Sequence, residues 1–378
     1  MKVIYLFWIS AISLFLSYAG YPLWLLFLSL FGKVSPATGS SGFLPSVTLL
    51  ISAYNEEKVI GEKIKNSLSL DYPSDKLSIV VVSDGSTDGT NTVVESFGAR
   101  GVSLVIVEER RGKTHALNQV IPGIASDIVV FSDANTMYDA QAITQLATPF
   151  EDPRVGAVCG ELTLHSPDGE MDTEALYWRY EQLLKRLESR TGGLTTFNGS
   201  IYAMRPALHQ PMLPGAANDF QHALQLAGQK VKTLYQPEAR GWEDTGSAPE
   251  VEFARRVRII SRGWRALFAN SFVLNPFRVG VFCSKILLHK VLRWLGPLFL
   301  FTVLATNFLL LTQLFYQVAL AAQLLFYTLA LLGAAGVSFG PVRAAYYFCL
   351  INAAAFWGLV RVVAGRDSST WVPTSHNQ

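Results

Sequence analysis

Short apolar runs alternate with helical patterns between residues 47 and 147, and each apolar run ends in polar residues. The runs cover residues 47–53, 77–83, 102–107 and 128–132, and the helical patterns that follow them cover 56–70, 88–97, 113–120 and 140–147. Short β-branched apolar runs bounded by polar residues are typical of buried strands. Strands that alternate with helices predict right-handed crossovers and a mainly parallel sheet, with a ligand crevice at the carboxyl ends of the strands.

The alternation is less regular after residue 150. A strand-like run at 155–160 precedes a helical pattern at 173–190, a glycine-rich turn and a shorter αβ region that ends near Gly246. A last helical pattern over 249–265 carries the arginines Arg255, Arg256, Arg258, Arg262 and Arg265. A run of charges on a helix is most often a solvated face.

An apolar segment precedes this domain. Residues 3–31 contain no charged residue, and about 20 apolar residues suffice to span a bilayer. The alternative is a signal peptide with Lys2 as its basic end and a cleavage site near Ala19. Because the apolar run continues past Ala19, we favour an uncleaved helix that is kinked near Gly20 and Pro22.

A basic amphipathic pattern follows the domain. Arg278, Lys285, His289 and Arg293 are spaced by seven, four and four residues, which places them on one helical face. A basic amphipathic helix directly before a membrane span is predicted to lie in the headgroup plane.

The remaining chain predicts three further spans. Residues 294–342 lack charge and are long enough for two spans with a turn near 313–317, and a third span covers 344–363, with Arg361 at its end. The predicted organisation is a transmembrane helix (1–32), a linker (33–45), a globular domain (46–272), an interfacial helix (273–294), three transmembrane helices (295–364) and a tail (365–378).

Composition and charge agree with a membrane-anchored globular domain. Of the 378 residues, 50% are apolar and 16% are charged, and the formal net charge of +2 is too small to indicate a nucleic-acid partner. Most Lys and Arg lie in the central domain, and Arg343 lies between the last two predicted spans. Both are therefore expected on the cytoplasmic side of the cell (inner) membrane. Cys159, Cys283 and Cys349 lack metal-binding spacing and are expected to be buried thiols.

Polar side chains stand at the ends of three predicted strands. Tyr54 and Glu56 follow the first strand, Asp84 the second, and Asp133 and Asn135 the fourth. Asp and Asn after a strand are most often turn formers. If the strands are parallel neighbours, however, these side chains converge on one crevice, and an Asp-x-Asn pair suits Mg2+ or Mn2+.

Gly112-Lys113-Thr114 follows a strand and opens a helix, as the end of a P-loop does. A P-loop also needs glycine where this chain has Val107, and no G-x-G-x-x-G follows the first strand. The first difference excludes a P-loop nucleotide triphosphatase, and the second argues against a dinucleotide-binding fold. Lys113 at a helix N-terminus can still hold a diphosphate.

Seven motifs occur in an order that resembles family 2 glycosyltransferases, in particular the membrane-embedded branch with cellulose, chitin-oligosaccharide and hyaluronan synthases. They are Ala53-Tyr54-Asn55-Glu56, Ser83-Asp84-Gly85-Ser86-Thr87-Asp88, Gly112-Lys113-x-x-Ala116-Leu117-Asn118, Ser132-Asp133-Ala134-Asn135, Asn198-Gly199-Ser200, Asn218-Asp219-Phe220 and Arg255-Arg256-Val257-Arg258. The resemblance implies an α/β GT-A (nucleotide-diphospho-sugar transferase) domain with one N-terminal and three C-terminal transmembrane helices.

The resemblance also implies roles for individual residues. Those that would bind a UDP-sugar donor are Tyr54, Glu56, Asp84, Lys113, Asn118, Arg255 and Arg258. Asp133 and Asn135 would hold Mg2+ or Mn2+. The acceptor would meet Asn198, Gly199 and Ser200. Asp219 would be the general base, although Asn218 or Asp219 capping the following helix is the alternative.

Two departures from the family pattern matter. Asn135 is neutral where such families often have a second Asp, so we expect either a lower metal affinity or an indirect second contact to the metal. Aligning the chain on Arg258 puts Ile259 where the synthases have a Trp that stacks on the acceptor sugar. Unless Trp264 substitutes for that Trp, long processive synthesis is not expected.

The predicted function is metal-dependent, inverting hexosyl transfer from a UDP-sugar to a saccharide or lipid-linked acceptor in surface or exopolysaccharide synthesis. Its partners would be membrane lipid and polysaccharide-export proteins. The alternatives are a polyprenyl-phosphate sugar transferase and a catalytically inactive membrane scaffold that keeps the fold.

Overall fold

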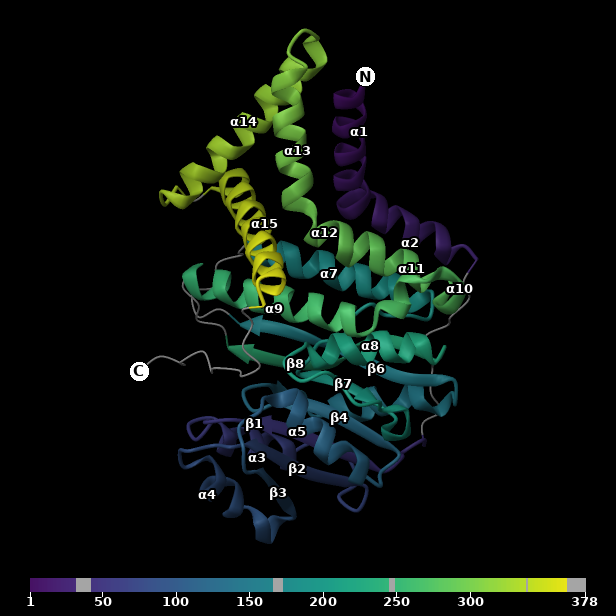
Figure 1. The fold of residues 1–378 in the computed structure, drawn as a ribbon. Helices are drawn as coiled ribbons and strands as arrows, with labels where there is room; N and C mark the ends of the chain where they lie inside the picture. Colours follow the sequence, from purple (N-terminus) through teal and green to yellow (C-terminus); the bar gives the residue numbers. More distant parts are fainter. Residues whose placement is uncertain (32–41, 166–172, 245–248, 338, 366–378) are drawn as a thin grey trace.

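The computed structural model describes residues 1–31, 42–165, 173–244, 249–337 and 339–365, and most of the predicted linker and tail lie outside these ranges. A layered α/β domain lies at one end of the molecule, and a group of apolar helices lies at the other (Figure 1). The predicted fold class is confirmed: an α/β GT-A-like domain with apolar helices at both ends of the chain.

The domain is built on one mixed sheet of eight strands in the order β3-β2-β1-β4-β7-β6-β8-β5. The strands are β1 (Val47–Ala53), β2 (Leu77–Asp84), β3 (Val102–Val107), β4 (Ile128–Asp133), β5 (Met137–Tyr138), β6 (Val155–His165), β7 (Ile201–Met204) and β8 (Lys232–Asp244). The first four in sequence are parallel neighbours, as predicted, whereas β7 runs antiparallel between β4 and β6. The carboxyl ends of β1, β2 and β4 therefore share one edge, where Ser52 pairs in register with Asp133.

Alternate residues of the central strands pack on opposite faces of the sheet. Leu49 and Ile51 of β1 belong to one buried cluster and Leu50 to another, so both faces are covered and the strand is apolar throughout. Helices α3 (Ile60–Leu68), α4 (Thr90–Glu95) and α6 (Ala142–Ala147) contribute to the first cluster. Helices α5 (Lys113–Val120) and α8 (Asn218–Gly228) contribute to the second.

A third cluster joins the domain to the apolar helices. Helix α7 (Thr173–Arg190) and helix α9 (Pro249–Ala269) lie on this side of the domain (Figure 1). Phe220 of α8, Ile260 of α9 and Ala355 of α15 (Gly340–Val363) share one buried core with Trp294. The site edge of the sheet and the apolar helices are thus connected through α8 and α9.

Three helices in the described ranges are long and apolar enough to cross a membrane: 2–29, 314–334 and 340–363. The first comprises α1 (Lys2–Phe15), a π-helical turn (Leu16–Gly20) at the predicted kink, and α2 (Tyr21–Ser29); the second is α14 (Leu314–Ala334). Residues 282–294 with α13 (Gly296–Leu309) form a fourth candidate that is bent by 61°. The described residues therefore contain one N-terminal and two or three C-terminal candidate spans.

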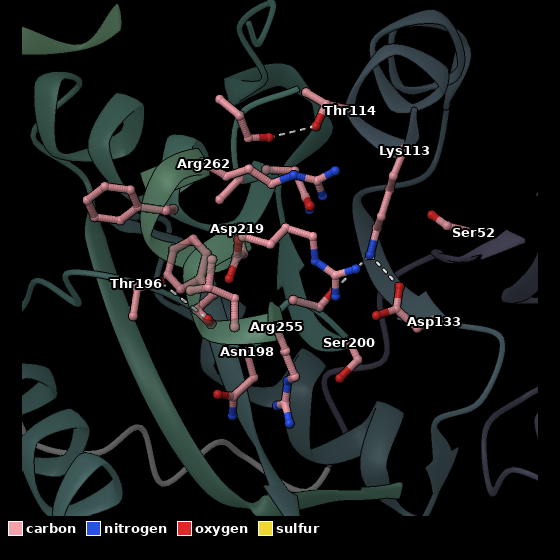
Figure 2. Close-up of a pocket in the computed structure, with 18 of the residues that line it drawn as sticks. Ser52, Lys113, Thr114, Asp133, Thr196, Asn198, Ser200, Asp219, Arg255 and Arg262 are labelled. Atoms are coloured by element: carbon pink, nitrogen blue, oxygen red, sulfur yellow. Dashed lines mark hydrogen bonds and ion pairs between the residues drawn. The ribbon is translucent and has the colours of Figure 1, made fainter. Parts of the chain in front are cut away.

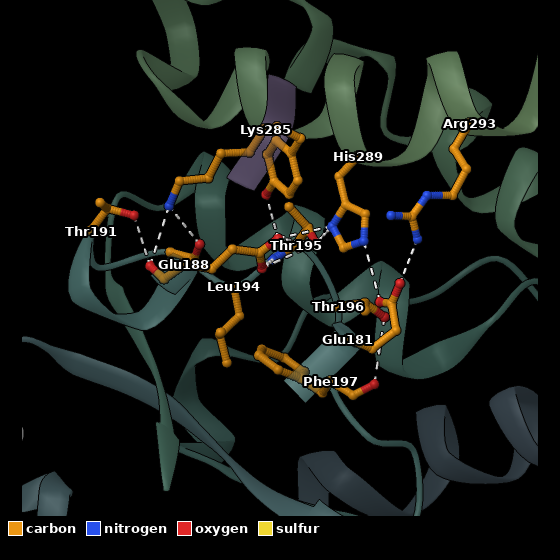
Figure 3. Close-up of polar contacts among 12 residues, drawn as sticks. Glu181, Glu188, Thr191, Leu194, Thr195, Thr196, Phe197, Lys285, His289 and Arg293 are labelled. Carbon is orange, nitrogen blue, oxygen red and sulfur yellow. Dashed lines mark hydrogen bonds and ion pairs between the residues drawn. The ribbon is translucent and has the colours of Figure 1, made fainter. Parts of the chain in front are cut away.

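The predicted interfacial helix is broken into α10 (Pro276–Val279), α11 (Phe282–Ile286), a π turn (Leu287–Val291) and α12 (Leu292–Trp294). Arg278 is exposed, but Lys285, His289 and Arg293 are buried and point toward α7 (Figure 3). The expectation that this basic face lies in the headgroup plane is therefore wrong for these three side chains.

Two glutamates of α7 explain this burial. The Glu188 carboxylate lies 2.9 Å from His289 Nδ1 and also accepts the Tyr21 hydroxyl proton, and Glu181 pairs with Arg293 (Figure 3). Burial alone would raise the pKa of Glu181, but the nearby Arg293 and His289 charges outweigh it and hold that pKa well below its usual range. Charges leave water only with such partners, and the pattern of one helix does not reveal an acidic partner helix.

Candidate active site

A cavity of about 470 Å³ opens at the carboxyl ends of β1, β2 and β4 and extends to α8, α9 and α12. Side chains from the sheet edge and from the helices face one another across it (Figure 2). All but one of the predicted site residues line it, namely Tyr54, Glu56, Asp84, Lys113, Asp133, Asn135, Asn198, Gly199, Ser200, Asp219, Arg255 and Arg258. The convergence expected from parallel strands is present.

Asp84 shapes the loop that starts α5. Its carboxylate accepts hydrogen bonds from the backbone N–H groups of Arg111 (3.2 Å) and Gly112 (2.8 Å). Gly112 has φ +93°, a conformation that residues with a Cβ rarely adopt, so this tight turn favours glycine. The turn places Lys113 at the helix start with its side chain in the cavity (Figure 2).

Lys113 connects the two sides of the cavity. Its ammonium forms an ion pair with Asp133 at the end of β4, and it lies 3.3 Å from the carbonyl oxygen of Gly199 (Figure 2). Both charged side chains remain partly exposed, Lys113 at 24% and Asp133 at 39%, so a ligand in the cavity can reach them. A cation and a carboxylate at one strand edge suit a diphosphate and its counter-ion.

The protein oxygens at this site are too few to hold a divalent ion unless a substrate diphosphate supplies further ligands. Asp133 and Asn135 both line the cavity, but the described residues contain no group of three His, Cys, Asp or Glu side chains arranged for a metal. Mg2+ and Mn2+ commonly take one or two protein oxygens and complete their shell with water and phosphate oxygens. One carboxylate and one amide therefore fit such an ion when a diphosphate is bound.

Tyr54 and Glu56 form the rim beside β1. The Arg110 guanidinium stacks 3.8 Å from the Tyr54 ring centroid. Burial, with the nearby charges of Asp133 and Asp88, raises the pKa of Glu56 to about 7. A protonated Glu56 can donate a hydrogen bond to a ligand, which an ionised one cannot.

We expect Glu56→Gln to change the pH dependence of stability. Because the folded pKa of about 7 exceeds the usual 4.5, the folded state binds the proton more tightly, and stability falls as pH rises from about 4.5 to about 7. The wild type should lose on the order of 1–3 kcal/mol over that window, whereas Glu56→Gln should not. Thermal unfolding of the purified protein at pH 5 and pH 8 measures this. The exposed Glu62→Gln is the matched control, and equal pH slopes for both variants would contradict the assignment.

Asp219 lies in the first turn of α8, on the wall opposite the strand ends. The N-cap of α8 is Ala217, and no side-chain hydrogen bond caps the helix there. Asn218 instead donates to the Tyr202 hydroxyl at 3.2 Å, so the cap alternative is not what the structure shows. Burial raises the pKa of Asp219, with the charges of Lys113 and Lys185 opposing it. A carboxylate with a raised pKa is a better proton acceptor than an ordinary one.

The Asn198-Gly199-Ser200 segment lies against Asp219. A Cβ added to Gly199 would stand 3.6 Å from the Asp219 carboxyl carbon. The Asn198 amide is engaged with Lys185 and with the carbonyl of Gly160 (2.6 Å), and the Ser200 carbonyl accepts from Tyr138 at 2.8 Å. These bonds fix the shape of the cavity next to the carboxylate.

Helix α9 presents a positive face to the cavity. Arg255, Arg258 and Arg262 occur at positions i, i+3 and i+7 and all line the cavity (Figure 2). Burial, with the Arg262 and Arg255 charges, lowers the pKa of Arg258 to about 10. Arg256 points the other way and donates to the Tyr347 hydroxyl of α15 at 2.8 Å. The arginine run is therefore not simply a solvated face.

Two expectations for single residues do not hold. The Asn118 amide bonds to both the N–H and the carbonyl of Met212, at 3.0 and 2.7 Å, and Asn118 does not line the cavity. Trp264 is 5% exposed, stacks on Phe268 and does not line the cavity, whereas Trp294 of α12 does. Asn118 therefore holds the segment after β7, and Trp264 does not stand in for the missing Trp.

The cavity wall also contains residues that we did not predict. They are Arg262, Glu243, Asp244, Trp178, Lys290 and Trp294, among others. Helical spacing from Arg258 was enough to find Arg262. Lys290 and Trp294 come from the helix expected to face headgroups, so the sequence pattern pointed away from the site.

Together the mixed sheet and the cavity at its carboxyl edge define a domain of the GT-A type. Residues 45–261 match the family described as glycosyltransferase-like family 2, and the chain belongs to this family. The predicted resemblance is thereby confirmed.

The individual proteins to which the chain is similar share at most 30% identity with it among those described below. Poly-beta-1,6-N-acetyl-D-glucosamine synthase of Staphylococcus aureus (strain COL) is 30% identical over 161 residues, 41% of this chain and 38% of that protein. The matched part thus spans well under half of that relative. Probable glycosyltransferase YdaM of Bacillus subtilis (strain 168) is 26% identical over 301 residues, 75% of this chain and 70% of that protein. The fold is similar (TM-score 0.70, 24% identity) to the mannosyltransferase PcManGT from Pyrobaculum calidifontis in complex with GDP-Man and Mn2+, over 94% of this chain and 99% of that one.

Proposed function

We propose that this glycosyltransferase transfers a sugar from a UDP-sugar, with inversion, to a saccharide or lipid-linked acceptor in surface polysaccharide synthesis. The observation that carries the proposal is the position of Gly199. Its carbonyl accepts a hydrogen bond from the Lys113 ammonium at 3.3 Å, and a Cβ at this position would stand 3.6 Å from the Asp219 carboxylate. A diphosphate beside Lys113 and an acceptor hydroxyl beside Asp219 would thus meet in one cavity. Similarity to the S. aureus synthase supports a polysaccharide product.

The chemistry follows from this arrangement. Asp219 accepts the proton of the acceptor hydroxyl while that oxygen forms its bond to the anomeric carbon. The bond from the anomeric carbon to the diphosphate breaks on the opposite face, and its electron pair leaves with the nucleoside diphosphate. Lys113, Arg255 and Arg258 stabilise the negative charge that develops there. No nucleophile on the protein is needed.

Asp133 and Asn135 are the residues that would hold Mg2+ or Mn2+ at the diphosphate. When bound, the ion would neutralise charge on the leaving group.

A panel of labelled donors tests the proposal. The purified protein in detergent is incubated with radiolabelled UDP-sugars and with GDP-mannose, together with a membrane lipid extract and Mn2+. Transfer of label from one UDP-sugar is expected. Transfer only from GDP-mannose would contradict the uridine assignment, and failure to bind any nucleotide would favour the inactive scaffold.

A second candidate is sugar transfer to a polyprenyl phosphate. The cations Arg255, Arg258, Arg262 and Lys290 line the cavity together with Trp294, at its junction with the apolar helices. Guanidinium groups suit a phosphate. A phosphate acceptor is already ionised, so this candidate predicts that Asp219 is dispensable.

We propose that the enzyme domain is cytoplasmic and that the turn between α13 and α14 is external. The basic residues of the domain and Arg343 support this orientation, and Lys2 and Arg366 oppose it weakly. In a variant whose three free cysteines are replaced by serine, Thr312→Cys should react with an impermeant maleimide in intact cells. Val337→Cys, in the turn before α15, should react only after the cells are opened. The reverse pattern would contradict the topology.

A further inference from the structure

A chain of hydrogen bonds runs from the first turn of α8 through the core to His209. The Asn218 amide nitrogen lies 3.2 Å from the Tyr202 hydroxyl, which lies 2.9 Å from His222 Nδ1. His222 Nε2 in turn lies 3.1 Å from His209 Nδ1. Tyr202 and His222 are completely buried, whereas His209 is half-buried.

The hydrogen bonds in this series can be donated in only one direction, from Asn218 toward His209. The Asn218 amide nitrogen only donates, so the Tyr202 oxygen accepts from it. Within the described residues the Tyr202 hydroxyl has these two partners alone, so its proton goes to His222 Nδ1. His222 then carries its proton on Nε2 and donates to His209 Nδ1, which must be unprotonated. Burial lowers the pKa of His222 to about 3 and lowers that of His209, which agrees with two neutral rings.

We infer that Tyr202, His222 and His209 are positioning residues for Asp219, acting through Asn218 on the first turn of α8 while His209 is neutral. The inference rests on the proposed role of Asp219 as the base. The Tyr202 ring is stacked between Phe131 and Phe197, with centroids 4.4 and 5.2 Å away, so its hydroxyl is a fixed point. Asn218, which is bonded to that point, precedes Asp219 directly in the chain.

Protonation of His209 reverses the direction of the hydrogen bond between His222 and Tyr202. A proton on His209 Nδ1 would face the proton on His222 Nε2, so His222 must move its proton to Nδ1. Tyr202 then receives two donors, and its own buried proton loses its acceptor, which is costly. The titratable group that faces His209 is His222 of α8, and the hydroxyl bonded to the other nitrogen of His222 is that of Tyr202 in β7. Burial and the nearby negative charges of Asp219 and Asp133 raise the pKa of Tyr202. The base is therefore held most firmly when His209 is neutral.

Imidazole nitrogen NMR on the full-length protein tests the direction of the chain without substrate. The chain has only six histidines, and His209→Asn and His222→Asn spectra assign the two signals. At pH 7.5 both rings should be neutral with the proton on Nε2. As His209 becomes charged at lower pH, the His222 proton should move to Nδ1. A His222 proton on Nδ1 at pH 7.5, or an unchanged His222 while His209 titrates, would overturn the inference.

Kinetics test the consequence. Tyr202→Phe keeps the stacking but removes the hydroxyl, and kcat should fall roughly tenfold, the effect of about one lost hydrogen bond, with donor KM unchanged. Tyr72→Phe, which loses a buried hydroxyl bonded to Pro45 at 2.6 Å, is the matched control with wild-type kcat. His209→Asn keeps an acceptor at the Nδ1 position without titrating, so its activity should decline less than that of the wild type at acid pH.

The two levels of the proposal fail differently. If Asp219→Asn is inactive while Tyr202→Phe behaves like Tyr72→Phe, the positioning role is wrong and the base stands. If Asp219→Asn transfers sugar normally, the base assignment itself is wrong. An acid decline in His209→Asn equal to that of the wild type would exclude His209 as the switch.

Discussion

Asp219→Asn should lower sugar transfer by roughly a hundredfold or more, the usual contribution of a general base. Asn has nearly the shape of Asp but does not accept a proton at neutral pH, and Asp219 is not the N-cap of α8. Folding and nucleotide binding should therefore survive. Initial rates with the donor found in the panel, together with UDP binding and thermal unfolding, measure the three properties separately.

A matched carboxylate is available as a control. Asp127 accepts hydrogen bonds from the N–H and hydroxyl of Ser46, at 2.9 and 2.6 Å, at the amino ends of the strands and away from the cavity. Asp127→Asn should cost stability without changing transfer. Near wild-type transfer by Asp219→Asn would remove the base from the mechanism and favour a phosphate acceptor, which needs none.

The site residues at the carboxyl edge of the sheet were predictable because local sequence patterns determine which strands end there. Strand–helix alternation predicts parallel neighbouring strands. That arrangement is sufficient to bring Glu56, Asp84 and Asp133 to one cavity. The resemblance to family 2 glycosyltransferases also singled out Asp219. Its position next to Gly199 depends on β7 running antiparallel beside β4, which no local pattern indicates.

The far wall of the cavity was not predictable for a different reason. The spacing of Lys285, His289 and Arg293 predicts a face in the headgroup plane, because the sequence of that helix does not show that Glu181 and Glu188 of α7 lie opposite it. Because the segment with His289 and Arg293 packs against α7, the adjacent residues Lys290 and Trp294 line the cavity. Asn118 shows the converse case, since a family motif residue is used here to hold a backbone segment.

Asp133→Ala should abolish metal-stimulated transfer, with a loss of roughly a thousandfold, as for removal of a main electrostatic stabiliser of a transition state. In the structure Asp133 pairs with Lys113, so a divalent ion at this carboxylate would have to share it with, or displace, the ammonium. Wild-type transfer should cease in excess chelator and return with Mn2+, whereas transfer by Asp133→Ala should not return. Lys113→Met separates the two cations, because it removes the ammonium and leaves Asp133 and Asn135 free for the ion.

If the ion is the main stabiliser, Lys113→Met should retain metal-dependent transfer at a reduced rate and need less Mn2+ for half-maximal activity, since no lysine competes for the carboxylate. If the ammonium alone balances the leaving group, wild-type transfer should persist in chelator and vanish in Lys113→Met. Full wild-type activity in excess chelator would therefore contradict the metal assignment and leave Asp133 with the role of holding Lys113 in place.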